Sequence, residues 1–125
     1  MSIDGYITTD LVLVSKTSAE DLIRSINGKT VAHIATQKIR GGYRHLFNTV
    51  RECNSAEKSI EVLLITLESL KDQNSEIFAE CSIEFSVGVV SDALPVAEYR
   101  IPRSLVTRIS QIGGDLSFVV YKENH

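Results

Sequence analysis

NSAEKSIEVLLITLESLKD, residues 54–72, contains the clearest helix of the chain and decides the fold class. Its apolar residues recur at intervals of three and four, as one face of a helix requires. That stripe consists of Ala56, Ile60, Leu63, Leu64, Leu67 and Leu70. The polar pair Asn54-Ser55 is typical of a helix start, and the polar run from Asp72 to Ser75 is typical of an end. Because a single apolar stripe has to be buried, we expect this helix to pack on a sheet.

Three strands are predicted before this helix. Residues 6–16 are rich in β-branched side chains, and the run Leu11-Val12-Leu13-Val14 predicts a strand covered on both faces. Residues 29–38 and 43–52 follow as two strands, and the turn Arg40-Gly41-Gly42 between them favours a hairpin. Alternation in the second of these strands places one set of side chains on a single face: Tyr43, His45, Phe47 and Thr49.

Two shorter helices and further strands complete the predicted pattern. Thr17-Ser18-Ala19-Glu20 predicts a helix start with Glu20 in the capping-box position, and Asn27-Gly28 predicts its end in a left-handed glycine. Pro102 fits the first turn of another helix, which Gly113-Gly114 ends. Alternating or β-rich segments predict strands at residues 81–89, 96–101 and 116–121.

These elements give the order β-α-β-β-α-β-(β)-α-β over one domain, residues 1–125. Hairpins and isolated helices are mixed along the chain, which is typical of the α+β class. We therefore predict a mainly antiparallel sheet of five or six strands with about three helices packed on one side.

Composition and the chain start indicate an ordinary globular protein. The chain has 125 residues, 43% hydrophobic and 23% charged, which is outside the range of disordered sequences. Met1 to Gly5 includes no basic region followed by an apolar core, and the longest apolar run, Val62 to Ile65, is too short for a bilayer. Cys53 and Cys81 match no zinc spacing and are interpreted as reduced thiols. We expect a cytoplasmic protein with no membrane partner, metal or cofactor.

Side chains with catalytic potential are few. His33 and His45 lie on the two strands of the predicted hairpin and could approach each other, but the preferred interpretation is a pair of partly exposed strand histidines. Cys53 beside a helix start, with His45 as its base, is a weaker alternative. The segment Arg40 to Arg44 leads into a strand, so a turn is favoured over a phosphate-binding loop. The sequence therefore predicts no catalytic residues.

The net charge of −3 is unevenly distributed along the chain. Residues 1–51 have a charge of +3, residues 52–92 a charge of −7 and residues 93–125 a charge of +1. Glu57, Glu61 and Glu68 are spaced to lie near one another on the central helix. Two interpretations remain open: a solvated helix face, the commoner meaning of a charge run, or a docking surface for a basic protein. Clustered acid disfavours direct binding of nucleic acid.

The element order and the acidic segment resemble those of small immunity proteins from bacterial toxin systems, including contact-dependent growth inhibition. The resemblance spans the opening strand and helix (Leu11 to Gly28), the Leu-rich helix (Ile60 to Leu70) and the final helix–Gly–strand segment (Ser104 to Tyr121). It extends more loosely to small bacterial α/β domains of unknown function.

This resemblance implies tight binding to a cognate toxin domain, often a nuclease, whose basic active site is covered by acidic and aromatic groups. The interface residues expected on that basis are Glu57, Glu61, Glu68, Asp72 and Glu76, with Tyr43 and Tyr99 as aromatic anchors. The alternatives are a small-molecule-sensing or regulatory α+β domain and, ranked last, a small enzyme that uses His33 and His45.

Overall fold

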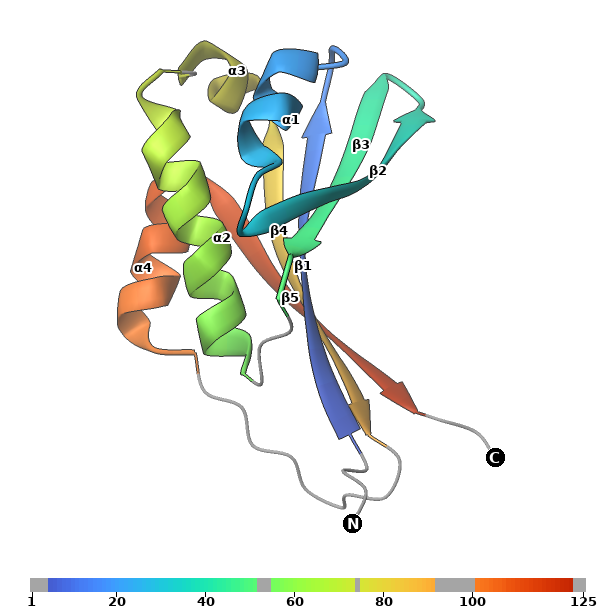
Figure 1. Cartoon of the computed structure of the whole chain (residues 1–125), viewed down its shortest axis with the longest axis vertical. Helices are drawn as coiled ribbons and strands as arrows, with labels where there is room; N and C mark the ends of the chain where they lie inside the picture. Colours follow the sequence, from blue (N-terminus) through green and yellow to red (C-terminus); the bar gives the residue numbers. More distant parts are fainter. Residues whose placement is uncertain (1–4, 52–54, 74, 92–100, 123–125) are drawn as a thin grey trace.

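The computed structural model describes residues 5–51, 55–73, 75–91 and 101–122. It contains one five-stranded sheet whose helices gather on one face (Figure 1). In chain order the elements are β1 (Gly5–Ser15), α1 (Glu20–Ile26), β2 (Val31–Ile39), β3 (Gly42–Thr49), α2 (Ala56–Lys71), α3 (Ser75–Glu80), β4 (Ser82–Ser91), α4 (Arg103–Gln111) and β5 (Gly114–Lys122).

The sheet has the strand order β2-β3-β1-β4-β5, with the long strand β1 at its centre. β1 is antiparallel to both β3 and β4, and β2 is antiparallel to β3. Only the pair β4–β5 is parallel among these strands, because α4 carries the chain back to the start of the sheet between them. The predicted α+β class with a mainly antiparallel sheet is therefore confirmed.

The strand register shows which side chains face the helices. Leu11 of β1 lies opposite Phe47 of β3 and Phe85 of β4, and all three side chains are fully buried. Side chains directly opposite in a ladder share a face, so this row lies on the helix side of the sheet. Glu84 and Asp115, which are also register partners, alternate to the other face and are exposed. We call that second face the open face.

The predicted stripe of α2 forms the centre of the core. Ala56, Ile60, Leu63, Leu64 and Leu67 are all buried, and Leu70 packs at the edge of the cluster. The helix begins as expected, because the Ser55 side chain accepts a hydrogen bond from the Lys58 backbone N–H. Burial of each large aliphatic side chain stabilises the fold by about 2 kcal/mol, so this stripe is a main source of stability.

The ends of α1 differ from the sequence prediction. Its N-cap is Ala19, in a left-handed conformation with φ of 48°, and no side chain caps the helix. The predicted capping box from Thr17 to Glu20 is therefore wrong. Gly28 is not left-handed either, since Asn27 ends the helix in an extended conformation. The buried side chains Leu22 and Ile26 hold α1 in place, so tertiary packing rather than capping fixes this short helix.

Helix α3 was not predicted, because its six residues are too few for a helical period to stand out from the polar run before them. Its Phe78 is buried and anchors it to the core. The strand predicted at residues 96–101 falls almost entirely outside the described residues.

Candidate functional site

Four polar side chains meet between β1 and the β2–β3 hairpin, and we call them the hairpin relay. They are Ser15, His33, Thr36 and His45. His45 Nε2 lies 2.8 Å from Ser15 Oγ, and His45 Nδ1 lies 2.9 Å from Thr36 Oγ1. Thr36 Oγ1 is also 2.7 Å from His33 Nε2. The sequence indicated that the two histidines could approach each other across the hairpin. In the structure both form a hydrogen bond with the same hydroxyl group, that of Thr36.

A β-bulge in β2 makes this meeting possible. His33 lies opposite Phe47, whereas Thr36 lies opposite His45, with the register shift between His33 and Ala35. In a regular strand, residues three apart point to opposite faces, but the extra residue of a bulge reverses the alternation. His33 and Thr36 therefore both face the helix side.

The turn of the hairpin is also fixed closely against β1. A β-carbon at Gly42 would lie 2.1 Å from the Ser15 carbonyl oxygen, so only glycine allows this approach. Gly41 precedes it with φ of 85°, a conformation that favours glycine. The Gly-Gly pair thus allows the hairpin turn to pack directly against the end of β1.

The hydrogen-bond partners determine which atom of each contact carries the proton. Ser15 Oγ donates to the Thr17 carbonyl oxygen at 2.6 Å, so it has to accept from His45 Nε2–H. A neutral His45 then has an acceptor at Nδ1, which Thr36 Oγ1–H satisfies, and Thr36 Oγ1 in turn accepts from His33 Nε2–H. Every polar atom of the His45 ring is therefore satisfied when the ring is neutral.

Burial favours the same neutral state. The His45 side chain is only 1% exposed, which corrects the expectation that both histidines are partly exposed. Burial lowers the pKa of His45 below its ordinary value, and the charge of His33 nearby lowers it further. Aromatic rings enclose the pair: Tyr43 stacks on His45 with centroids 6.3 Å apart, and Phe47 lies 5.2 Å from His33.

The Ser15–His45 contact does not have the arrangement of a nucleophile and its base. A base has to accept the hydroxyl proton, but the Ser15 proton is directed at the Thr17 carbonyl oxygen. Ser15 is also only 4% exposed, so a substrate has no direct access to its oxygen. The contacts of this pair are those of a structural polar network that joins the hairpin to the central strand.

The predicted acidic residues Glu61 and Glu68 form a second cluster, the Arg108 clasp. Arg108 of α4 binds Glu68 with two hydrogen bonds, of 2.6 and 3.0 Å, and Glu61 with one of 2.6 Å. Glu61 and Glu68 lie two turns apart on one face of α2, so a single guanidinium spans both. The clasp fastens α4 to α2 above the core.

The clasp is partly solvated. The side chains of Glu61, Glu68 and Arg108 are 41%, 34% and 28% exposed. The hydrogen bond from Arg108 lowers the pKa of the Glu68 carboxyl, and the same contact raises the pKa of the guanidinium. Two carboxylates share one cation, so one negative charge is left without compensation inside the cluster.

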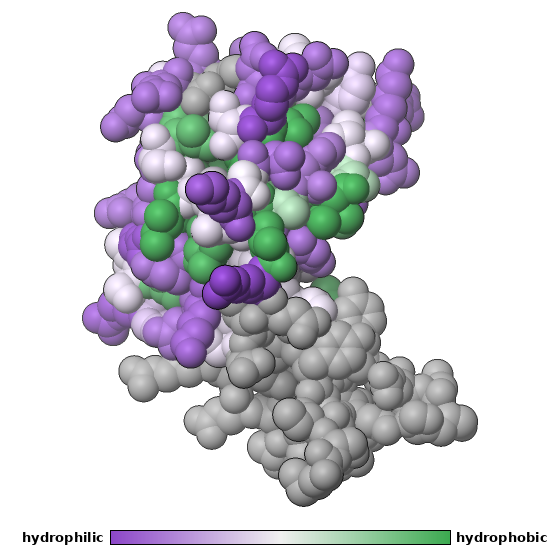
Figure 2. All heavy atoms as spheres, in the orientation of Figure 1, coloured by the Kyte–Doolittle hydropathy of each residue, from purple (hydrophilic) through white to green (hydrophobic). Residues whose placement is uncertain are grey.

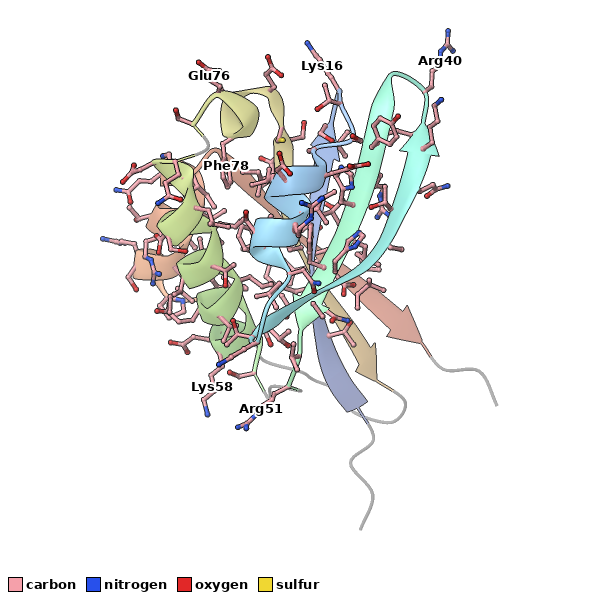
Figure 3. All side chains as sticks on the ribbon, turned by 45° about the horizontal axis from the view of Figure 1, so that its top comes forward. Lys16, Arg40, Arg51, Lys58, Glu76 and Phe78 are labelled. Atoms are coloured by element: carbon pink, nitrogen blue, oxygen red, sulfur yellow. The ribbon has the colours of Figure 1, made fainter. Side chains whose placement is uncertain are left out.

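The other predicted carboxylates are exposed and spread over the molecule. Glu57, Asp72 and Glu76 make no ion pair within the described residues. Figure 3 shows Glu76 on the outer side of α3 and Lys58, the neighbour of Glu57, at the opposite end of α2. A helix of this length spans about 24 Å. Asp72 ends α2 on the side of α3, four residues before Glu76, and Glu57 lies in the first turn at the other end of α2.

The aromatic anchors are not brought to the acidic helices. Tyr43 is on β3 in the hairpin, and α1 lies between that hairpin and α2 (Figure 1). Tyr99 lies outside the described residues, as does Cys53. Cys81 is a half-buried free thiol whose pKa is raised by burial and then by Glu80, which makes it less reactive.

The sequence did not predict the contacts of Arg108 with Glu61 and Glu68. The signal available was weak: α4 carries Arg108 on the same side as its buried residues Leu105 and Ile109, and an arginine beside a buried face often has a carboxylate partner. Only the packing of α4 on α2 identifies the partners. Within residues 5–51, 55–73, 75–91 and 101–122, no three His, Cys, Asp or Glu side chains are arranged to hold a metal ion.

Comparisons with known proteins leave the family open. The chain matches no protein-family model, no curated protein and no solved structure. In the part of the chain that the structure describes, none of the helices has the length and apolar character needed to cross a membrane.

Proposed function

We propose that this protein is an immunity protein that binds and neutralises a cognate toxin domain with a basic surface. The observation that carries the proposal is the division of its carboxylates into two groups. Glu61 and Glu68 are occupied by Arg108, whereas the carboxylates where α2 meets α3 have no cation of the fold bound to them in the described residues. We call this second group the acidic corner; it consists of Asp72, Glu76 and Glu80, all exposed.

The local structure directs these carboxylates outward. Phe78 is buried and points inward from α3, while Glu76 lies on the opposite side of that helix (Figure 3). Lys71, the nearest lysine in sequence, donates from Nζ to the Gln111 carbonyl oxygen at 2.9 Å. Its charge is therefore held at the end of α4.

An uncompensated acidic corner suits a basic partner. Like charges on one surface repel each other, and a cationic protein relieves that repulsion while being attracted over distances of about 10 Å. Such charges mainly increase the rate of association and the specificity for the partner. In this proposal Asp72 and Glu76 lie at the centre of the interface, Glu57 at its far end, and Glu61 and Glu68 contribute less because Arg108 offsets them.

The exposed apolar side chains do not favour a different surface of the helix layer. Ile65 on α2 and Val106 on α4 are about half exposed. Figure 2 shows separate apolar patches among hydrophilic side chains on this face of the molecule. Separate apolar patches of this kind suit the contacts that surround a charged interface.

The test is protection of cells against the toxin. The proposal predicts a large secreted protein encoded immediately upstream of this chain's gene, and the toxin domain of that protein is the one to express. Growth should stop when that domain is expressed alone and recover when this chain is co-expressed. The variant Asp72→Lys/Glu76→Lys should lose protection, and Glu84→Lys/Asp115→Lys, with the same change in charge on the open face, should keep it. Absence of rescue by the unchanged chain would contradict the proposal.

A further inference from the structure

The two edges of the sheet differ in how they are protected. The outer strand β2 is interrupted by the bulge after His33, where Ile34 and Ala35 are exposed, and continues with the exposed polar residues Thr36, Gln37 and Lys38. Bulges and lysines on an edge strand are devices that prevent the addition of another strand. β5, the other end of the sheet among the described strands, has no bulge: its register with β4 is unbroken from Gly114 to Lys122, and its one lysine, Lys122, is its last residue.

The centre of β5 is also apolar and exposed on both faces. Phe118 is 52% exposed on the helix side, and Val119 is 39% exposed on the open face. Helix α4 covers only the start of the strand, where Ile109 would lie 3.2 Å from a β-carbon at Gly114. Figure 1 shows β5 leaving the helices and ending well beyond them. A long, regular and apolar edge of this kind is a site at which another strand adds.

We propose that a second copy of this chain occupies this edge, by antiparallel pairing of β5 with β5 around a two-fold axis at Phe118. Phe118 is the middle residue of the nine in β5, so this register pairs the whole strand from end to end. A two-fold axis through an antiparallel ladder has to pass through a residue paired with itself.

The side chains that would face each other in a register centred on Phe118 are also compatible. Phe118 lies against Phe118 of the other copy on the helix side, an aromatic pair that removes two half-exposed rings from water. Asp115 of one copy lies opposite position 121 of the other, which is a tyrosine, so the Asp115 residues of the two copies do not face each other. A symmetric contact of this type closes the sheet into one ten-stranded unit and leaves no further free β5 edge.

Sedimentation velocity of the full chain tests the association. The unchanged protein should show a concentration-dependent shift from one to two copies, and Phe118→Lys should weaken the association by more than about tenfold while remaining folded, because the side chain is exposed. Ile34→Lys, at an equally exposed position on β2, serves as the control and should dimerise as the unchanged chain does. A protein that stays monomeric at all concentrations, or a dimer that survives Phe118→Lys, would overturn the inference.

Disulfide formation tests the register without relying on stability. In a background with Cys53→Ser and Cys81→Ala, Phe118→Cys should form a dimer under mild oxidation, because directly opposite residues lie about 5 Å apart between Cα atoms, within disulfide range. Val119→Cys should not crosslink, because its copies are offset by two positions along the strands. Crosslinking at position 119 in place of 118 would overturn this register.

Discussion

The hairpin relay and the Arg108 clasp join distant parts of the chain by opposite means. In the relay, Ser15 and His45 are 30 residues apart in sequence, and the contact is buried and made by neutral groups. In the clasp, Arg108 and Glu68 are 40 residues apart, and the contact is half-exposed and made by ions. Removing a charge from water costs much free energy. Ionic contacts therefore remain at the surface, and polar contacts in the interior are formed by neutral groups.

The comparison also separates structural from functional polar groups. Within the described residues, the relay and the clasp satisfy their polar atoms mostly from within the fold, and their loss should be seen as lost stability. The acidic corner has no such partner in the described part of the chain, and its loss should be seen mainly in binding.

The largest effect is expected for His45→Ala. The substitution opens a cavity in the buried hairpin and leaves Ser15 and Thr36 without their partner, so the free energy of unfolding should fall by about 3 kcal/mol. Urea denaturation measures it. The matched change His33→Ala, at the less buried end of the relay, should cost less than half as much. Equal losses at the two positions would show that burial does not distinguish them.

Stability should also depend on pH through His45. Its pKa is lowered in the folded state, so below the ordinary value of about 6.5 the unfolded chain binds more protons than the folded one. The free energy of unfolding should therefore be largest above pH 6.5 and fall as the pH drops through that value. His45→Gln, which cannot titrate, should flatten this part of the profile in chemical denaturation at pH 5 to 8. An unchanged slope in His45→Gln would assign the dependence to other groups.

A smaller effect is expected for the clasp. Arg108→Met keeps much of the side-chain length but removes the charge, and because the three groups are partly solvated the loss should be about 1 kcal/mol. The loss should shrink as salt is raised. A double-mutant cycle with Glu68→Gln should give a coupling energy of about 0.5–1 kcal/mol, and a coupling near zero would contradict a role of this pair in holding α4.

The smallest change in stability is expected at the exposed carboxylates. Glu57→Gln and Glu76→Gln should each alter the free energy of unfolding by less than about 0.5 kcal/mol, because neither side chain makes an ion pair in the described residues. Thermal denaturation with the unchanged chain as the reference is sufficient. A loss above 1 kcal/mol would mean that these groups support the fold.

The sequence predicts the framework of this protein better than its sites. The stripe of α2 and the alternation of β3 follow from simple periods, so both were predictable with their buried faces. Helix α3 and the Ala19 cap were not, because packing of Phe78, Leu22 and Ile26 stabilises segments whose own signals are weak. The position of Thr36 beside His33 depends on a bulge, which no pattern in residues 31–39 reveals.

The total charge of the acidic segment was predictable from the sequence, but its distribution over the surface was not. The acidic block is evident from counting, yet the separation of Glu61 and Glu68 from Asp72 and Glu76 depends on where α4 places Arg108. That placement is a long-range property of the fold. Residues near each other in sequence thus have different roles because only some of them meet a cation from another helix.

Calorimetric titration of this chain with the toxin domain that the proposal predicts in the neighbouring gene tests the central proposal most directly. We expect a 1:1 complex whose affinity falls at least about tenfold in Asp72→Lys/Glu76→Lys and stays within about twofold in Glu84→Lys/Asp115→Lys. Equal affinity in both double variants, or absence of heat on mixing the unchanged proteins, would contradict it.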